Sequence, residues 1–136
     1  MPTPLLCQQI SFAQVQKVVH SFYERLQADA QLSHFFKHIA DFSQHEHRIS
    51  CFWWMSMGGK LHTPPSIDMI NKHMPLGIGS DDLQRWLQLF ETTLNEQLPP
   101  ASAQAWFEKA LQISQRVQAI VIDKKNRGLQ ISEADT

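Results

Sequence analysis

Glycine and proline divide this sequence into regions that can and cannot form long helices. The 136-residue chain holds five glycines and seven prolines, and most of them lie between Gly58 and Pro100. Glycine interrupts a helix by its backbone freedom, and proline by its missing amide hydrogen. The regions before and after this part can therefore form uninterrupted helices. Residues 60–79 allow at most one short helical piece, near residues 66–74.

Apolar residues recur at helical spacing, which predicts amphipathic helices. The first helix begins at a capping box of Ser11 with Gln14, and the second at a box of Ser43 with Glu46. The third begins near Ser80, and the fourth follows the paired prolines. The stripes of the first, third and fourth helices are Val15, Val18, Val19, Phe22, Tyr23 and Leu26; Leu83, Trp86, Leu87, Phe90 and Leu94; and Trp106, Ala110, Ile113, Val117 and Ile120. No strand pattern competes, so we expect an all-α fold.

Length and composition fit one globular domain. Apolar residues make up 43% of the chain and charged residues 18%, so a core can form and disorder of the whole chain is excluded. We expect an N-terminal extension over residues 1–10, a helical domain over 11–123 and a polar tail over 124–136. The net charge of −1 implies no strongly basic face, which makes nucleic acid a poor candidate partner.

The cysteines and the N-terminus indicate where such a chain resides. Cys7 and Cys51 are too few for a disulfide framework, and their spacing matches no metal motif. The first eleven residues lack the basic start and apolar run of a secretory signal. No stretch approaches the roughly 18 apolar residues of a membrane span. We therefore expect a cytoplasmic protein with reduced thiols and no membrane partner.

The irregular stretch between the second and third helices is long for a helical bundle. Connections in bundles are typically about 2–8 residues, so a weakly structured stretch over 60–79 suggests a functional loop or a cavity wall. His73 lies near its end, two residues before Pro75. Because proline limits helix there, this side chain sits where a break fixes its direction. Neutral imidazole is a common metal ligand, and a ligand needs such a fixed direction.

His45 and His47 compete for the inward face of the second helix. At about 100° per residue, His45 shares a face with Phe52, whereas His47 points away with Cys51 and Trp54. Phe52 favours His45 as the inward residue, and Trp54 keeps the alternative open. A zinc site on one helix face needs a spacing of three or four residues, so this pair does not suit one.

Tyr23 and Trp86 each carry one polar hydrogen at the tip of an apolar side chain. Such groups find a partner when they are buried. The more common arrangement is a core aromatic bonded to a backbone carbonyl, and the functional alternative is two donors that point into one pocket. The neighbouring aromatic residues do not decide, because they fit a plain core and the lining of a flat apolar ligand equally well. They are Phe35, Phe36, Phe52, Trp53 and Trp54.

Taken together, the order and spacing of these residues resemble the truncated haemoglobins, and within them the third group. The resemblance spans roughly residues 12–122. The pieces that carry it are Phe22-Tyr23-Glu24-Arg25-Leu26, Asp29, Gln31-Leu32-Ser33, Phe35-Phe36, His45, Phe52-Trp53, Lys72-His73-Met74, Leu83, Arg85-Trp86-Leu87, Leu89-Phe90-Glu91 and Thr93.

The resemblance implies a shortened globin fold, two helices over two, around haem b with its iron bound by His73. Tyr23 and Trp86 would donate hydrogen bonds to dioxygen, or to a related diatomic ligand, at a five-coordinate or weakly six-coordinate iron. His45 would stand at the distal gate. The residues expected to contact the haem are Phe36, His45, Phe52, His73 and Trp86.

Three functions remain open at this point. The first is binding or transport of dioxygen, and the second is a haem enzyme that handles peroxide or nitric oxide. A nitric-oxide dioxygenase would need a separate reductase, because the chain has no flavin or nicotinamide motif. The third is a haem-free interaction module, which gives no reason for His73, Tyr23 and Trp86 to occur together. We therefore expect a dioxygen-binding haem protein.

Overall fold

The computed structural model describes residues 5–63 and 77–123, and within these ranges it contains helices and no strand. This confirms the expected all-α fold. His73 and its neighbours on the irregular stretch lie outside the described residues. The elements in chain order are η1 (Leu6–Gln8), α1 (Phe12–Ala28), η2 (Ser33–Phe36), α2 (Phe42–Ser56), α4 (Ser80–Gln97), α5 (Pro100–Arg116) and η4 (Val117–Asp123).

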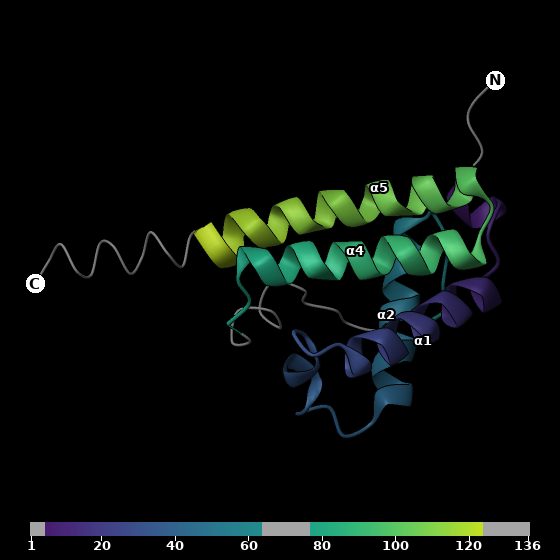
Figure 1. Ribbon diagram of the computed structural model, residues 1–136. Coiled ribbons are helices and arrows are strands. Elements are labelled where there is room, and N and C mark those ends of the chain that lie inside the picture. The colour runs from purple at the N-terminus through teal and green to yellow at the C-terminus, as the bar shows by residue number, and fades with distance from the viewer. Residues whose placement is uncertain (1–4, 64–76, 124–136) are drawn as a thin grey trace, which may run out of the picture.

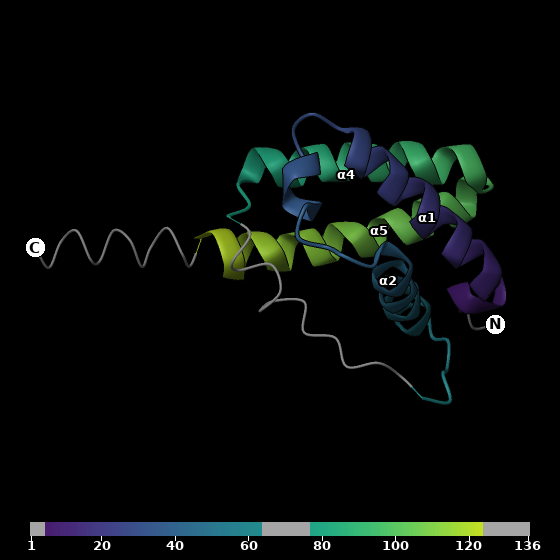
Figure 2. The same cartoon turned by 90° about the horizontal axis from the view of Figure 1, so that it is seen from below.

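The long helices form two pairs. The helices α4 and α5 run antiparallel and side by side, and α2 crosses behind α1 (Figure 1). The helix α1 contacts both α2 and α4, and so it joins one pair to the other (Figures 1 and 2). None of the helices in the described ranges is long and apolar enough to cross a membrane.

The first predicted helix start is confirmed. Ser11 Oγ accepts a hydrogen bond from the Gln14 amide at 3.2 Å, and Gln14 Oε1 accepts one from the Ser11 amide at 2.9 Å. The paired bonds satisfy amide hydrogens that have no partner within the helix. This box fixes the direction in which α1 leaves the N-terminal turn.

The second predicted cap, Ser43 with Glu46, is wrong. Asp41 is the N-cap of α2, and its Oδ1 accepts a hydrogen bond from the Gln44 amide at 3.1 Å. A carboxylate at this position satisfies an amide and also interacts favourably with the positive end of the helix dipole. Glu46 is therefore left free to pair with another helix.

Stacked aromatic rings form the centre of the core. The Trp53 ring stacks on Phe90 with centroids 5.5 Å apart, and Trp86 stacks on Phe90 at 5.2 Å. Trp106 meets Trp53 and Phe90 edge-on, at 5.8 and 5.6 Å. Aromatic side chains can bury about 150–250 Å² each, and such ring pairs add to the gain from burial. This stack ties α2 and α5 to α4.

The segment that follows α5 differs from the prediction. Ile120 was expected on the apolar stripe, yet it is 38% exposed, and Ile122 is buried instead. The cause is that η4 is π-helical, with bonds from residue i to i+5. Val117 and Ile122, five residues apart, are therefore both buried.

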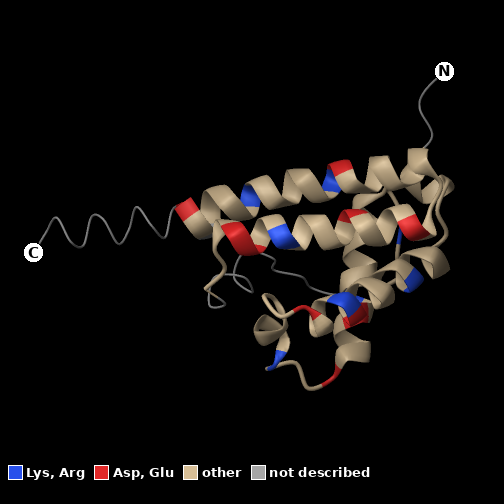
Figure 3. Ribbon diagram, in the orientation of Figure 1, with Lys and Arg blue, Asp and Glu red and all other residues tan. Residues whose placement is uncertain are grey.

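Charged residues of both signs are interspersed along α4 and α5 in the view of Figure 3. Two ion pairs join α1, or the turn that follows it, to α4. Arg25 pairs with Glu96, and Arg85 pairs with Asp29. The second pair bears directly on the site described below.

Candidate functional site

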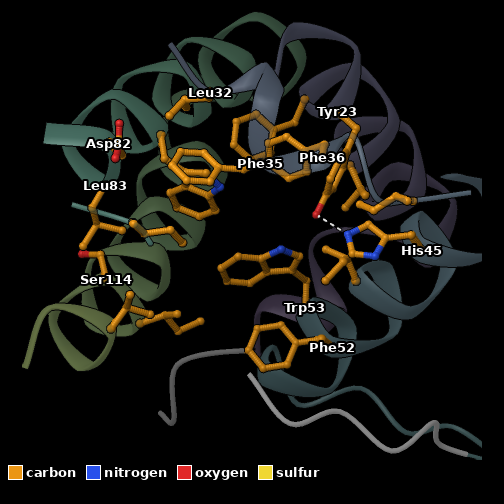
Figure 4. Close-up of a pocket in the computed structure, with 18 of the residues that line it drawn as sticks. Tyr23, Leu32, Phe35, Phe36, His45, Phe52, Trp53, Asp82, Leu83 and Ser114 are labelled. Carbon is orange, nitrogen blue, oxygen red and sulfur yellow. Dashed lines mark hydrogen bonds between the residues drawn. The ribbon is translucent and has the colours of Figure 1, made fainter. Parts of the chain in front are cut away.

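A cavity of about 480 Å³ lies between the helices, and every described element except η1 contributes to its wall (Figure 4). Most of the wall is apolar, with side chains such as Val19, Phe22, Phe35, Ile49 and Ile113. The few polar groups belong to Tyr23, His38, His45, Trp53, Asp82, Trp86 and Ser114. Pockets that enclose small molecules and cofactors have this character and volumes of about 300–1,000 Å³.

The structure brings most of the predicted site residues to this wall. Tyr23, Phe36, His45, Phe52 and Trp86 all line it. The roles assigned to them above stay predictions. His73 lies outside the described residues, so the proposed iron ligand stays a prediction as well.

His47 does not line the cavity. Its side chain is exposed, and its Nε2 lies 3.6 Å from the Sγ atom of Cys51, one turn further along α2. The helical geometry therefore separates the two histidines of α2 as the sequence predicted, with His45 facing inward.

Tyr23 and His45 form a polar pair at one end of the cavity. Tyr23 Oη lies 3.0 Å from His45 Nε2, and Figure 4 shows this bond across from Asp82, Leu83 and Ser114. The Tyr23 ring packs edge-on against Phe36 at 5.6 Å and His45 at 5.1 Å. These contacts fix the direction of the hydroxyl.

Burial, followed by the negative charge of Glu46, raises the pKa of Tyr23 well above its ordinary value of 10.0. The hydroxyl therefore keeps its proton at neutral pH and can act as a neutral donor.

The direction of the bond between Tyr23 and His45 depends on the proton of the imidazole. If Nε2 carries no hydrogen, Tyr23 donates to it, and the hydroxyl hydrogen is occupied. If Nε2 carries a hydrogen, His45 donates to Tyr23, and the hydroxyl hydrogen is free for a ligand. In the second case the two hydrogen bonds coexist and polarise each other.

Trp86 brings an indole ring with its N–H group to the cavity wall. Its ring is held between Phe22, which it meets edge-on at 5.2 Å, and the Phe90 stack. Within the part of the chain that the structure describes, its indole N–H has no hydrogen-bond partner, although the ring lines the cavity. The role of this N–H as a donor to a ligand stays a prediction.

A partly buried ion pair holds the η2 wall in place. Arg85 donates to Asp29 Oδ1 from Nε at 3.0 Å and from Nη2 at 2.7 Å. The other carboxylate oxygen accepts from the Gln31 and Leu32 amides at 3.2 and 3.1 Å. The Arg85 guanidinium, with these amides, lowers the pKa of Asp29 below its ordinary value of 3.8. The pair fixes the turn that leads into Phe36.

Sequence reasoning missed three polar residues of the wall. Asp82 stands near the start of α4, and its side chain accepts a hydrogen bond from the Gly79 amide at 3.0 Å. His38 and Ser114 were given no role. The only signal for Ser114 was its place beside Ile113, which lies on the apolar stripe of the fourth helix.

Solved structures of haemoglobins share this fold. The haemoglobin of the thermophilic phototrophic bacterium Chloroflexus aurantiacus superimposes with a TM-score of 0.70 and 24% identity, over 84% of this chain and 97% of that one. A point mutant of the truncated haemoglobin of Tetrahymena pyriformis, in its Fe(III) form, gives 0.63 and 20%, over 79% and 87%. No curated protein sequence matches this chain significantly.

The helices and these structural likenesses define the chain as an all-α protein with a shortened globin fold. The sequence model of the bacterial-like globins matches residues 9–120. The chain belongs to the bacterial-like globin family. Membership of this family implies a haem cofactor and a diatomic ligand.

The cavity fits such a cofactor. Its wall is largely aromatic and aliphatic, as a flat macrocycle requires, and its polar groups are few. Among the described residues, no three His, Cys, Asp or Glu side chains gather to hold a metal ion. Haem iron needs no such group, because the macrocycle supplies four ligands and the protein needs to add only one.

Proposed function

We propose that this protein is a group III truncated haemoglobin that binds dioxygen reversibly at haem b. The observation that carries the proposal is the Tyr23–His45 pair, which presents a neutral hydroxyl at the wall of an otherwise apolar cavity. When bound, haem supplies an iron atom that takes a diatomic ligand.

The chain supplies polarity on one side of the ligand. Tyr23 donates its hydroxyl hydrogen to the partly negative ligand, and His45 orients that hydroxyl. Trp86 provides a second donor from α4. Donors in a dry cavity are effective because no water competes for the ligand and the donors need no reorganisation.

His73 is our proposed iron ligand. Its support is in the sequence, where it precedes Ile78 by five residues, and Ile78 lines the cavity. Phe36 and Phe52 are proposed to pack against the macrocycle, because both present apolar rings to the cavity.

The test is gas binding by the reconstituted full-length protein. After haemin is added and reduced, dioxygen should shift the visible bands, and removal of the gas should restore the deoxygenated spectrum. Acid–acetone should extract all of the haem, because the sequence has no Cys-x-x-Cys-His attachment motif.

Two outcomes would overturn the proposal. Immediate irreversible oxidation by dioxygen, with rapid peroxide-driven dye turnover, would favour the haem-enzyme alternative. Failure of haemin to bind at all would favour an interaction module.

A further inference from the structure

The helices α1 and α2 are joined one turn away from the Tyr23–His45 pair by a second polar contact. His20 stands three residues before Tyr23 on α1, so the two share a helix face. Its Nδ1 lies 2.8 Å from Oε1 of Glu46, the residue that follows His45 on α2. Two adjacent residues of α2 are therefore each bonded to α1.

The second ring nitrogen of His20 also has a carboxylate partner. His20 Nε2 lies 2.9 Å from Glu24 Oε1, one turn further along α1. A carboxylate only accepts, and a neutral imidazole has a single N–H, so it cannot donate to both. Only the imidazolium form of His20 can donate to both carboxylates at once.

The carboxylates of Glu46 and Glu24 both act on the titration of His20 in the same direction. Hydrogen bonding to Glu46 and its charge, with a smaller part from Glu24, raise the pKa of His20 above its ordinary value of 6.5. Among the described residues, Glu24 and Glu46 are the charged side chains paired with it. Glu46 is only 15% exposed, and its charge also acts on Tyr23.

We propose that His20 is a positioning residue of the distal site, whose protonated ring holds Glu46 against α1 and so fixes the Tyr23–His45 pair at the cavity wall. The inference rests on the proposed ligand-binding function of that cavity. Loss of the proton leaves a single N–H for the two carboxylates and removes the positive charge that compensates Glu46 near Tyr23. A negative charge there weakens the hydroxyl as a donor and repels a partly negative ligand.

The direction of the pH effect follows. The contact of protonated His20 with Glu46 and Glu24 is complete below pH 6.5, and its charge is lost as pH rises through the raised pKa of His20. Dioxygen release should therefore speed up as the solution becomes alkaline. Because His20 is 64% exposed, the effect is that of a solvent-screened pair, roughly two- to fivefold in the release rate constant.

The test is a pH titration of histidine and tyrosine ring signals by NMR, in the full-length protein with and without haemin. His20 should titrate above 6.5, and the Tyr23 and His45 signals should show a step at the same midpoint. His20→Gln and Glu46→Gln should both remove that step. Glu24→Gln should lower the midpoint less than Glu46→Gln and keep the step, and His62→Ala, at an exposed control histidine, should change neither.

Tyr23 and His45 signals that stay flat through the His20 midpoint, or that keep their step in His20→Gln, would overturn the proposal. So would dioxygen release in the haem-loaded protein that has the same pH profile in wild type and His20→Gln. A chain that binds no haem would refute the proposed function instead, and the ring signals would still decide the coupling.

Discussion

Replacing Tyr23 with phenylalanine is the sharpest perturbation of the proposed distal site. The substitution keeps the ring and its edge-on contacts with Phe36 and His45, and it removes one oxygen atom. That oxygen lies 3.0 Å from His45 Nε2 and is the donor that we assign to the ligand. The change therefore tests polarity with little change in packing.

The magnitude follows from the charge on the ligand. A hydrogen bond to a charged group contributes about 1.5–3 kcal/mol, and about 1.4 kcal/mol is a factor of ten. Tyr23→Phe should therefore speed dioxygen release by roughly ten- to a hundredfold. Carbon monoxide carries little negative charge, so its release should change much less.

Stopped-flow release rates for the two gases decide the matter. His45→Leu is the matched comparison, because it removes the partner of the hydroxyl and leaves the hydroxyl itself. If His45 is a gate, this variant should alter uptake and release of both gases. Equal acceleration of both gases in Tyr23→Phe would mean that the residue acts through packing. Unchanged dioxygen release would refute Tyr23 as the main donor.

Three further predictions concern other parts of the site. His73→Ala should lower haem affinity strongly and His47→Ala only slightly, and equal losses in a haem titration would contradict the ligand assignment. Trp86→Phe should also speed dioxygen release, with an effect that is not additive with the tyrosine variant because both donors serve one ligand; additive rates would argue against a shared ligand. Asp29→Ala should cost about 2–3 kcal/mol, roughly 6–15 °C in thermal unfolding, because it removes a charged pair and two backbone contacts. Because pairing lowers the pKa of Asp29, the contribution of this residue to the free energy of unfolding is full above pH 3.8. That contribution should be lost as pH falls through the lowered pKa. A difference in stability between wild type and Asp29→Ala that does not change with pH would contradict this reasoning.

Local signals in the sequence were enough for much of the fold. The Ser11 box and the apolar stripe of α1 were predictable, because a helix start and a buried face depend on residues within a few positions of one another. The inward direction of His45 followed from the same periodicity. The π-helical turn that exposes Ile120 had no such local signal.

Contacts between helices were not predictable in the same way. Periodicity shows which face of a helix is buried, but it does not show which residue of the next helix lies opposite. The pairs Asp29–Arg85 and His20–Glu46 depend on that relative placement. For this reason the sequence assigned Glu46 to a helix cap, whereas the structure pairs it with α1.

Haemin titration of the full-length protein tests the central claim most directly. Because Trp53 and Trp86 line the cavity, haem bound there should quench tryptophan fluorescence as the Soret band grows. We predict that both signals change together and break sharply at one haem per chain. A Soret band that does not saturate, or that saturates without quenching, would contradict the claim that this cavity holds the haem.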